Sequence, residues 1–252
     1  MTEEPSRPAG SCTCLEMTSR RPQKPTRFHA ERQDVRAPGW IRLLELIEQA
    51  AADGREVFTP LTDLTPEQRR QVITLPPTIA KLTAVRHLGL YGSNLVRIPP
   101  EIGAMSSLEM FDPYTSPRLH WFPYEITHCT QLTGSRVSTR RIYGNYKYRS
   151  HFPQLTDSAS EFDLDDLDPG VWGAAAIRTC SVCGQAVTSA NLRQVWISLW
   201  TSGADVLPLL VNACSQECVE TLPEPTKGYV PQPHRGGPDI KQPAPGHHPL
   251  TE

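Results

Sequence analysis

The sequence has no long hydrophobic run. Its longest apolar piece, around Leu207 to Val211, has the length of a β-strand, whereas a membrane-spanning helix needs about 20 apolar residues. The first 36 residues also lack the apolar stretch of a secretory signal, because Arg20, Arg21 and Lys24 interrupt them. We therefore expect a cytoplasmic protein that has no membrane partner.

The chain also lacks an excess of either charge and any familiar catalytic motif. Its 25 Lys and Arg against 27 Asp and Glu leave a formal net charge of −2, so nucleic-acid binding would need a local patch. It has no glycine-rich phosphate loop, no Gly-x-Ser-x-Gly elbow and no His-Glu-x-x-His motif. The eight His residues are scattered along the chain. The sequence therefore predicts a protein that is not an enzyme.

Apolar residues are scarce at 38%, and the 25 prolines are about twice the average usage. This composition predicts an ordered middle between a disordered N-terminal tail, residues 1–36, and a proline-rich disordered tail, residues 223–252. Residues 150–170 are predicted to form an acidic linker that ends in a run of carboxylates. The run lacks the glycine and the terminal glutamate of a calcium-binding hand, so a solvated linker is the better interpretation.

Order is expected to begin with helices. Apolar side chains recur at three- and four-residue spacing from Trp40 to Ala51, which predicts an amphipathic helix that ends at Gly54. A second short helix is predicted after Thr65, because Thr65 can cap it and Gln68 stands where a capping-box partner reaches back. Residues 37–74 are thus predicted to form a helical N-terminal cap.

A period of 23–24 residues follows over residues 75–149. The phrase Leu75-Pro76-Pro77-x-Ile79-x-x-Leu82 returns as Ile98-Pro99-Pro100-x-Ile102-x-x-Met105 and then as Phe122-Pro123-x-x-Ile126-x-x-Cys129. The apolar positions downstream keep the same phase: Val85, Leu88 and Leu90, then Leu108 and Phe111, then Leu132 and Val137. Because one such unit cannot bury its own apolar face, about three must stack.

These phrases resemble leucine-rich repeats of the kind whose helical side begins with Leu-Pro-x-x-Ile. Val85-x-x-Leu88-x-Leu90-x-x-Ser93-x-Leu95 fits the strand half of such a repeat, with Ser93 where Asn is usual. The second copy departs at Pro113, which occupies a core position, and the third keeps only part of the pattern. The resemblance implies an α/β leucine-rich-repeat solenoid of about three repeats.

Four of the seven cysteines lie in two close pairs, Cys180-x-x-Cys183 and Cys214-x-x-x-Cys218. Two thiolates at this spacing can point at one ion, and two pairs complete a tetrahedron, which predicts structural zinc. An odd total of cysteines also fits metal binding in a reducing compartment better than a disulfide framework. Cys129 falls on a core position of the repeats and is expected to be a small buried apolar residue.

The chain between the two pairs is predicted to form a hairpin. Val195, Ile197 and Leu199 alternate with Trp196, Ser198 and Trp200, and Leu207 to Asn212 returns as a second strand. Ser215 is placed to cap a short helix. Knuckle, hairpin and helix together resemble a treble-clef zinc module, so residues 171–222 are predicted to be a small α+β zinc-knuckle module. The whole arrangement is similar to bacterial leucine-rich-repeat proteins that end in a cysteine knuckle, a resemblance that implies an architecture and no activity.

Two groups of residues are candidates for binding a partner. The first group should face outward from the strands of the repeats: His87, Tyr91, Met110, Asp112, Tyr114 and Arg136. The second is a basic and aromatic run between 136 and 149 that has no acidic residue and could hold phosphates: Arg140, Arg141, Lys147 and Arg149.

We therefore expect a non-catalytic module that binds another protein through the concave face of the repeats, on which the strands lie, and is stabilised by zinc. The alternative is a nucleic-acid-associated zinc protein that uses the patch at 136–149. Redox or metal sensing by the cysteine pairs is a further option.

Overall fold

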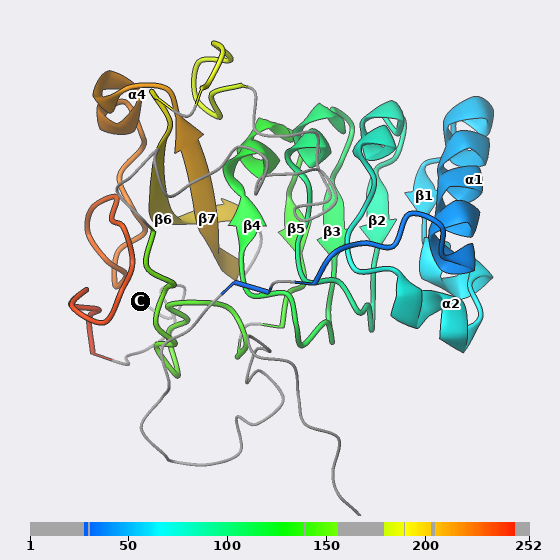
Figure 1. Ribbon diagram of the computed structural model, residues 1–252, viewed down its shortest axis with the longest axis horizontal. Coiled ribbons are helices and arrows are strands. Elements are labelled where there is room, and N and C mark those ends of the chain that lie inside the picture. The colour runs from blue at the N-terminus through cyan, green and yellow to red at the C-terminus, as the bar shows by residue number, and fades with distance from the viewer. Residues whose placement is uncertain are drawn as a thin grey trace, which may run out of the picture.

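The computed structural model describes residues 28–29, 31–138, 140–155, 179–188, 190–202 and 205–244. Figure 1 shows a row of short parallel strands, with helices α1 and α2 at one end and a long hairpin with helix α4 at the other. The protein is thus a mixed α/β fold that contains one parallel and one mixed sheet. The two ends of the row are formed by the segments predicted as the helical cap and the cysteine module.

The parallel sheet is built from one short strand per unit. Its strands are β1 (Val57–Phe58), β2 (His87–Gly89), β3 (Met110–Asp112) and β5 (Gly134–Ser135), in the order β1-β2-β3-β5. The register pairs His87 with Met110 and Met110 with Gly134, so the partners lie 23 and 24 residues apart. The 23–24-residue period of the sequence is therefore the step from one strand to the next.

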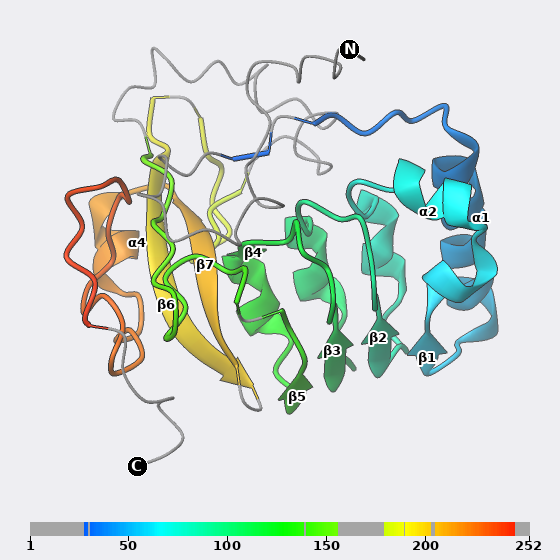
Figure 2. The same ribbon diagram turned by 90° about the horizontal axis from the view of Figure 1, so that it is seen from below.

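A 3₁₀-helix follows proline in each of the repeated units. These helices are η2 (Pro77–Lys81), η3 (Pro100–Ala104) and η4 (Tyr124–His128). The preceding prolines fix an extended backbone, and short i→i+3 bonds then recur in phase, such as Ile79 N to Pro76 O and Ile102 N to Pro99 O. Figure 2 shows these helices lined up on one side of the strand row.

The core confirms the positions selected by the periodicity. Leu82, Leu88, Ile102, Phe111 and Ile126 are all at most 1% exposed. Every other apolar position of the repeating phrase is buried as well: Leu75, Ile79, Val85, Leu90, Ile98, Met105, Leu108, Phe122, Cys129, Leu132 and Val137. Burial of Cys129 raises the pKa of its thiol to about 11, which agrees with its predicted role as a core residue.

The first end of the stack is formed by α1 (Pro38–Asp53) and α2 (Pro66–Gln71). The left-handed conformation of Gly54 ends α1, and the predicted capping box of α2 is present, since Thr65 and Gln68 exchange hydrogen bonds. The cap is not purely helical, however. Strand β1 and the 3₁₀-helix η1 (Pro60–Asp63) also lie within residues 37–74, so this segment contributes the first strand of the parallel sheet.

The second sheet joins the repeats to the cysteine module. Strand β4 (Phe122–Pro123) pairs in parallel with β7 (Asp205–Ala213), and β7 pairs antiparallel with β6 (Arg193–Ser202), as the sequence predicted for the hairpin. Side chains of the repeats and of the hairpin belong to one continuous cluster of buried residues. The two parts therefore share one hydrophobic core.

The predicted limits of disorder were too wide at the N-terminus. Residues 28, 29 and 31–36 pack along the repeat stack (Figure 2). Phe28 lies against Trp121 and Trp196 at ring-centroid distances of 5.6 and 5.5 Å, and the Gln33 side chain bonds to the backbone of Gln71 and Ile73. The prediction of disorder is therefore wrong for these residues, because side-chain partners far along the chain hold them.

The prediction is wrong in the same way for residues 223–244. Tyr229, Val230 and His234 are buried, and the backbone of His234 pairs with Trp196 on the outer edge of β6. The prediction of a linker is also wrong for its first residues, because Phe152 and Leu155 are buried. Residues 1–27, 156–178 and 245–252 lie outside the described part of the chain.

No helix within the described residues is long and apolar enough to cross a membrane.

Candidate metal centre

The first cysteine pair sits in a tight turn. Thr179 and Ala186 form an antiparallel bridge, and Cys180 N donates to Gln185 O at 2.7 Å. Gly184 closes the turn at φ +73°, a backbone conformation that favours glycine, and its N–H donates to Cys180 O. The turn therefore holds residues 180–183 in a fixed shape.

The second pair lies where β7 ends and α4 (Gln216–Glu220) begins. Ser215 caps α4 by accepting a hydrogen bond from Cys218 N at 3.2 Å, as the sequence predicted. Cys214 follows Ala213, which is fully buried in the core. A strand end and a capped helical turn therefore present the two thiols on the same side.

Backbone and side-chain bonds clamp the turn onto β7. Ser181 N donates to Asn212 O at 2.8 Å, and Asn212 N donates to Ser181 Oγ at 3.0 Å. Ser181 also bonds to the carboxyl of Glu125, a residue of η4. Burial raises the pKa of Glu125, and this is only partly offset by the bond from Ser181. The cysteine turn is thus attached both to the hairpin and to the last repeated unit.

The structure brings all four predicted ligands together. The Sγ atoms of Cys180, Cys183, Cys214 and Cys218 all lie within 4.8 Å of one another. Cys183 Sγ and Cys214 Sγ are 3.5 Å apart, and Cys214 Sγ and Cys218 Sγ are 3.7 Å apart. A disulfide would need about 2.05 Å, so these are free thiols at non-bonded distance.

These distances match a single tetrahedral ion. Four sulfurs at about 2.3 Å from a zinc ion lie about 3.8 Å from one another, from the geometry of a tetrahedron. Sulfur ligands of a multi-iron cluster sit on different iron atoms and are spread further apart. The four-cysteine cluster can therefore hold one metal ion.

The surroundings of Cys180 favour its thiolate form. Burial raises the pKa of this thiol, but hydrogen bonds from the backbone N–H groups of Cys183, Val182 and Cys214 lower it to about 7. Two of these donors, Val182 N and Cys214 N, lie 3.4 Å from Cys180 Sγ. Such N–H groups orient a sulfur ligand and support its charge when a metal is bound.

Neighbouring groups raise the pKa values of Cys214 and Cys218. Hydrogen bonding with Cys183, followed by burial and the remaining sulfurs, raises the pKa of Cys214 to about 12. The bond with Ser215 lowers the pKa of Cys218, but the bond with Cys183, burial and the bond with Cys180 together outweigh it, so the pKa is raised. Four thiolates cannot be gathered at these distances without a compensating cation, so the cluster is suited to a divalent metal.

Exposure differs across the site. Cys180 is buried at 3% exposure and packs with the common core, whereas Cys183 is exposed and Cys214 and Cys218 are intermediate. One side of the site therefore belongs to the interior of the fold and the other lies at the surface. A metal ion here would fasten the turn and α4 to the end of the hairpin.

The predicted outward residues of the strands lie in register on one surface. We call this surface the open face and define it by Val57, His87, Gly89, Tyr91, Met110, Asp112, Tyr114, Gly134 and Arg136. The rings of Tyr91 and Tyr114 are 6.1 Å apart and are 64% and 46% exposed. Asp112 and Arg136 form the expected pair at 3.5 Å. His87 and Met110 are half-buried.

The basic run divides into outward and inward residues. Arg140 and Lys147 are exposed. Arg149 is half-buried, and its guanidinium donates to the carbonyls of Gly144 and Gly228 and lies 4.9 Å from the ring centre of Tyr229. Arg141 is partly buried, and its carbonyl accepts a hydrogen bond from His120 Nδ1. Arg149 is therefore a structural residue, which the sequence alone did not indicate.

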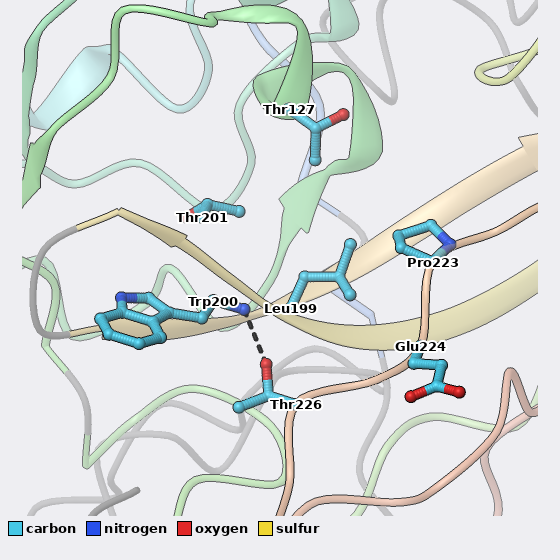
Figure 3. A pocket seen from close by; sticks show the side chains of 7 residues that line it. All are labelled: Thr127, Leu199, Trp200, Thr201, Pro223, Glu224 and Thr226. Atoms are coloured by element: carbon cyan, nitrogen blue, oxygen red, sulfur yellow. Dashed lines mark hydrogen bonds between the residues drawn. The ribbon is translucent and has the colours of Figure 1, made fainter. Parts of the chain in front are cut away.

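A hollow of about 520 Å³ lies between η4, the end of β6 and the segment after α4. In Figure 3, Leu199 points toward Thr127, whereas the Trp200 ring and the Glu224 carboxylate extend away from the centre. Among the described residues, Glu224 is the one ionisable side chain that lines the hollow, so this part of the lining has no pair of groups for acid–base catalysis. The cysteine cluster remains the stronger candidate site.

No model of a known protein family matches the chain, and a search of curated proteins finds none that is similar to it.

Proposed function

We propose that this protein is a zinc-stabilised leucine-rich-repeat protein, without enzymatic activity, that binds another protein through the open face. The observation that carries the binding proposal is the exposed pair of Tyr91 and Tyr114 on that face. Three features support the proposal: the repeating architecture, the chemistry of the four sulfurs, and the composition of the open face.

The assignment to leucine-rich repeats is supported by features that recur at the same step. Each unit places one parallel strand beside the last, followed by a 3₁₀-helix after proline. Ser93 and Ser116, which stand 23 residues apart, share a hydrogen bond between their hydroxyls at 2.6 Å and are both buried. Ser116 also lies within bonding distance of Leu90 O. A polar ladder at this position is what stacked turns of a solenoid require to satisfy buried backbone groups.

The choice of zinc rests on the donor set. Four thiolates in a tetrahedron select zinc or iron among the common metals, and zinc is the usual choice for closed structural sites of this kind. Four sulfur ligands leave no open position, so the metal would stabilise the fold rather than carry out a reaction. Zinc bound in this way contributes about 10–16 kcal/mol of apparent folding free energy in small modules.

The open face has the composition of a protein-binding surface. Within the described residues, seven large hydrophobic side chains are exposed, and three of them, Val57, Tyr91 and Tyr114, belong to this face. Its charges are paired internally: Arg86 at its border bridges Glu56 and Glu109, and Arg136 pairs with Asp112. Exposed tyrosines among neutralised charges favour a partner that contributes apolar contacts rather than strong charge.

A library of random dodecapeptides displayed on phage provides a test. We expect zinc-loaded protein to enrich peptides whose binding is lost in the double variant Tyr91→Ala, Tyr114→Ala. The matched control is the double variant Ile41→Ala, Trp200→Ala, which removes two exposed hydrophobic side chains elsewhere and should retain binding. Failure to enrich any peptide, or equal binding by both double variants, would reject the open face as the binding surface.

A further inference from the structure

Two segments that are distant in sequence form one surface beside the metal end of the fold. Residues 140–155 and 226–244 lie side by side in both Figure 1 and Figure 2. Arg149 Nη2 donates to Gly228 O at 2.6 Å, and Gln242 Nε2 donates to Arg149 O at 3.3 Å. Further along, Leu155 N donates to Arg235 O at 2.7 Å. The two segments are therefore joined over most of their length.

Both segments are basic. The first contains four Lys and Arg and no carboxylate, and the second contains three Lys and Arg and one carboxylate, Asp239. These two segments are therefore positively charged, although the whole chain has a formal net charge of −2. We call it the basic surface and define it by Arg140, Arg141, Lys147, Arg149, Lys227, Arg235 and Lys241. Its second half comes from a segment that the sequence assigned to a disordered tail.

Three of these cations are placed to meet a ligand. Arg140, Lys147 and Lys241 are exposed. Arg149 holds the two segments together. Arg141, Arg235 and Lys227 make interactions of their own, although Lys227 is also exposed. The last four contribute to the local potential, and the first three can reach an anion directly.

An aromatic ring accompanies the exposed cations. Tyr148 is 44% exposed, and Lys147 Nζ lies 5.9 Å from the centre of its ring. The buried side chain of Asn145 fixes this turn, because its Oδ1 accepts hydrogen bonds from Lys147 N at 2.8 Å and Tyr148 N at 2.6 Å. The cation and the ring are thus presented from a fixed backbone.

We propose that the basic surface binds single-stranded nucleic acid, with Arg140, Lys147 and Lys241 on successive phosphates and Tyr148 stacked on a base. Phosphates and an unstacked base are what a combination of cations with an exposed ring recognises. In these two segments Tyr148 is the one exposed large hydrophobic side chain, so the surface offers no apolar group for insertion into a membrane. This binding is separate from that proposed for the open face.

The number of contacts sets the expected salt dependence. For single strands, log K falls with log salt at a slope of about −0.7 for each phosphate contact, so three contacts give a slope of about −2. Binding should then weaken about 16-fold between 50 and 200 mM salt. Each exposed cation that is removed should reduce the slope by about 0.7.

The test measures fluorescence anisotropy of a labelled oligouridine of about 15 nucleotides with the full chain loaded with zinc. We expect a slope near −2 for the wild type and a slope near zero for Arg140→Glu, Lys147→Glu, Lys241→Glu, with affinity reduced at least tenfold at 50 mM salt. The control Arg36→Glu, Arg42→Glu, Lys81→Glu has the same net charge but changes residues at the opposite end of the fold. The affinity of this control for the oligouridine should stay within about threefold of the wild type, a margin that covers the effect of the changed net charge.

Tyr148 gives an independent readout. Tyr148→Ala should weaken binding at least fivefold with little change of slope, and Tyr148→Phe should restore it. Because residues 157–168 of the same chain contain six carboxylates that would compete with RNA, a variant with Asp163→Asn, Asp165→Asn, Asp166→Asn and Asp168→Asn is measured in parallel. The proposal is overturned if neither protein binds at 50 mM salt, if the triple reversal binds as well as its control, or if heparin binds and RNA does not.

Discussion

Asp205 joins the tip of the β6–β7 hairpin to the parallel sheet, and its removal should destabilise the whole fold. Its Oδ2 accepts hydrogen bonds from Val137 N at 3.1 Å and from Ser135 Oγ at 3.4 Å, and the residue is 6% exposed. Asp205→Ala would leave the buried N–H of Val137 without this acceptor. A hydrogen bond to a charged group contributes about 1.5–3 kcal/mol, and an unsatisfied buried donor costs about 1–3 kcal/mol.

We therefore expect Asp205→Ala to lower the free energy of unfolding by about 2–3 kcal/mol, or the melting temperature by about 4–12 °C for a chain of this size. Asp112→Ala is the matched control. It also removes a carboxylate beside β5. Its 3.5 Å pair with the exposed Arg136 and the 3.3 Å bond that it accepts from Tyr114 N both lie at the surface, so together they should contribute no more than about 1 kcal/mol. Urea unfolding of zinc-loaded protein measures both changes.

Hydrogen exchange read by peptide mass shows where stability is lost in Asp205→Ala. Because the repeats and the hairpin share one core, peptides covering β2 and β3 should lose protection together with those covering β6 and β7. Equal stability of the Asp205 and Asp112 variants would show that the bonds of Asp205 do not hold the hairpin to the sheet. Loss of protection confined to the hairpin would contradict the single cooperative unit.

Two further predictions concern the interior. Burial lowers the pKa of His234 to about 4, whereas the pKa in the unfolded chain is near 6.5, so between pH 6.5 and 4 the unfolded chain binds the proton more readily. The free energy of unfolding should therefore fall by up to about 3 kcal/mol as the pH drops through this window. His234→Asn should reduce that loss, measured by urea titrations at constant zinc. An unchanged pH dependence would contradict the buried neutral imidazole. A Cβ at Gly103 would lie 2.6 Å from Glu125 O, so Gly103→Ala should force the 3₁₀-helices η3 and η4 apart and lower the free energy of unfolding by about 1–3 kcal/mol. The control is Gly54→Ala, where nothing lies within 4 Å of the new Cβ. This variant should cost only about 1 kcal/mol, because of the left-handed backbone conformation at Gly54. Equal stability of the two glycine variants would show that the helices tolerate the extra atom.

The repeated core could be predicted because each unit buries the same positions. Leu88 and Phe111 stand 23 residues apart and are both fully buried. The need for an apolar side chain at this position therefore recurs in the sequence at a fixed spacing. Strand β1 escaped prediction for the opposite reason. Val57 and Phe58 form a strand of two residues, too short for any alternation to be recognised, and its place is set by pairing with His87 and Leu88.

The segments that were assigned to disorder failed for a different reason. Phe28 and Gln33 find their partners at Trp196, Gln71 and Ile73, and no local pattern encodes contacts over such separations. The segment around His234 is rich in proline, which favours a prediction of disorder, yet it covers the edge of β6 through paired backbone bonds with Trp196. Composition reports on local preference, whereas these segments are ordered by tertiary contacts.

At the candidate metal site, spacing was sufficient to identify the four sulfurs but not their environment. Pairs of cysteines two or three residues apart can converge on one ion in any suitable turn. The N–H groups of Val182 and Cys214 that bond to Cys180 depend on how the turn and the strand end meet, which the sequence does not express. The same applies to the Glu125–Ser181 contact that ties the turn to the repeats.

The most direct test of the account is the metal content of the untagged protein, measured by elemental mass spectrometry together with thermal unfolding with and without a strong chelator. The four-cysteine cluster predicts close to one zinc per chain and a large loss of stability on chelation, with Cys180→Ser and Cys214→Ser abolishing metal binding while Cys129→Ser leaves the stoichiometry unchanged. Protein that contains no metal, has all four thiols free to react and unfolds at the same temperature with and without chelator would contradict it.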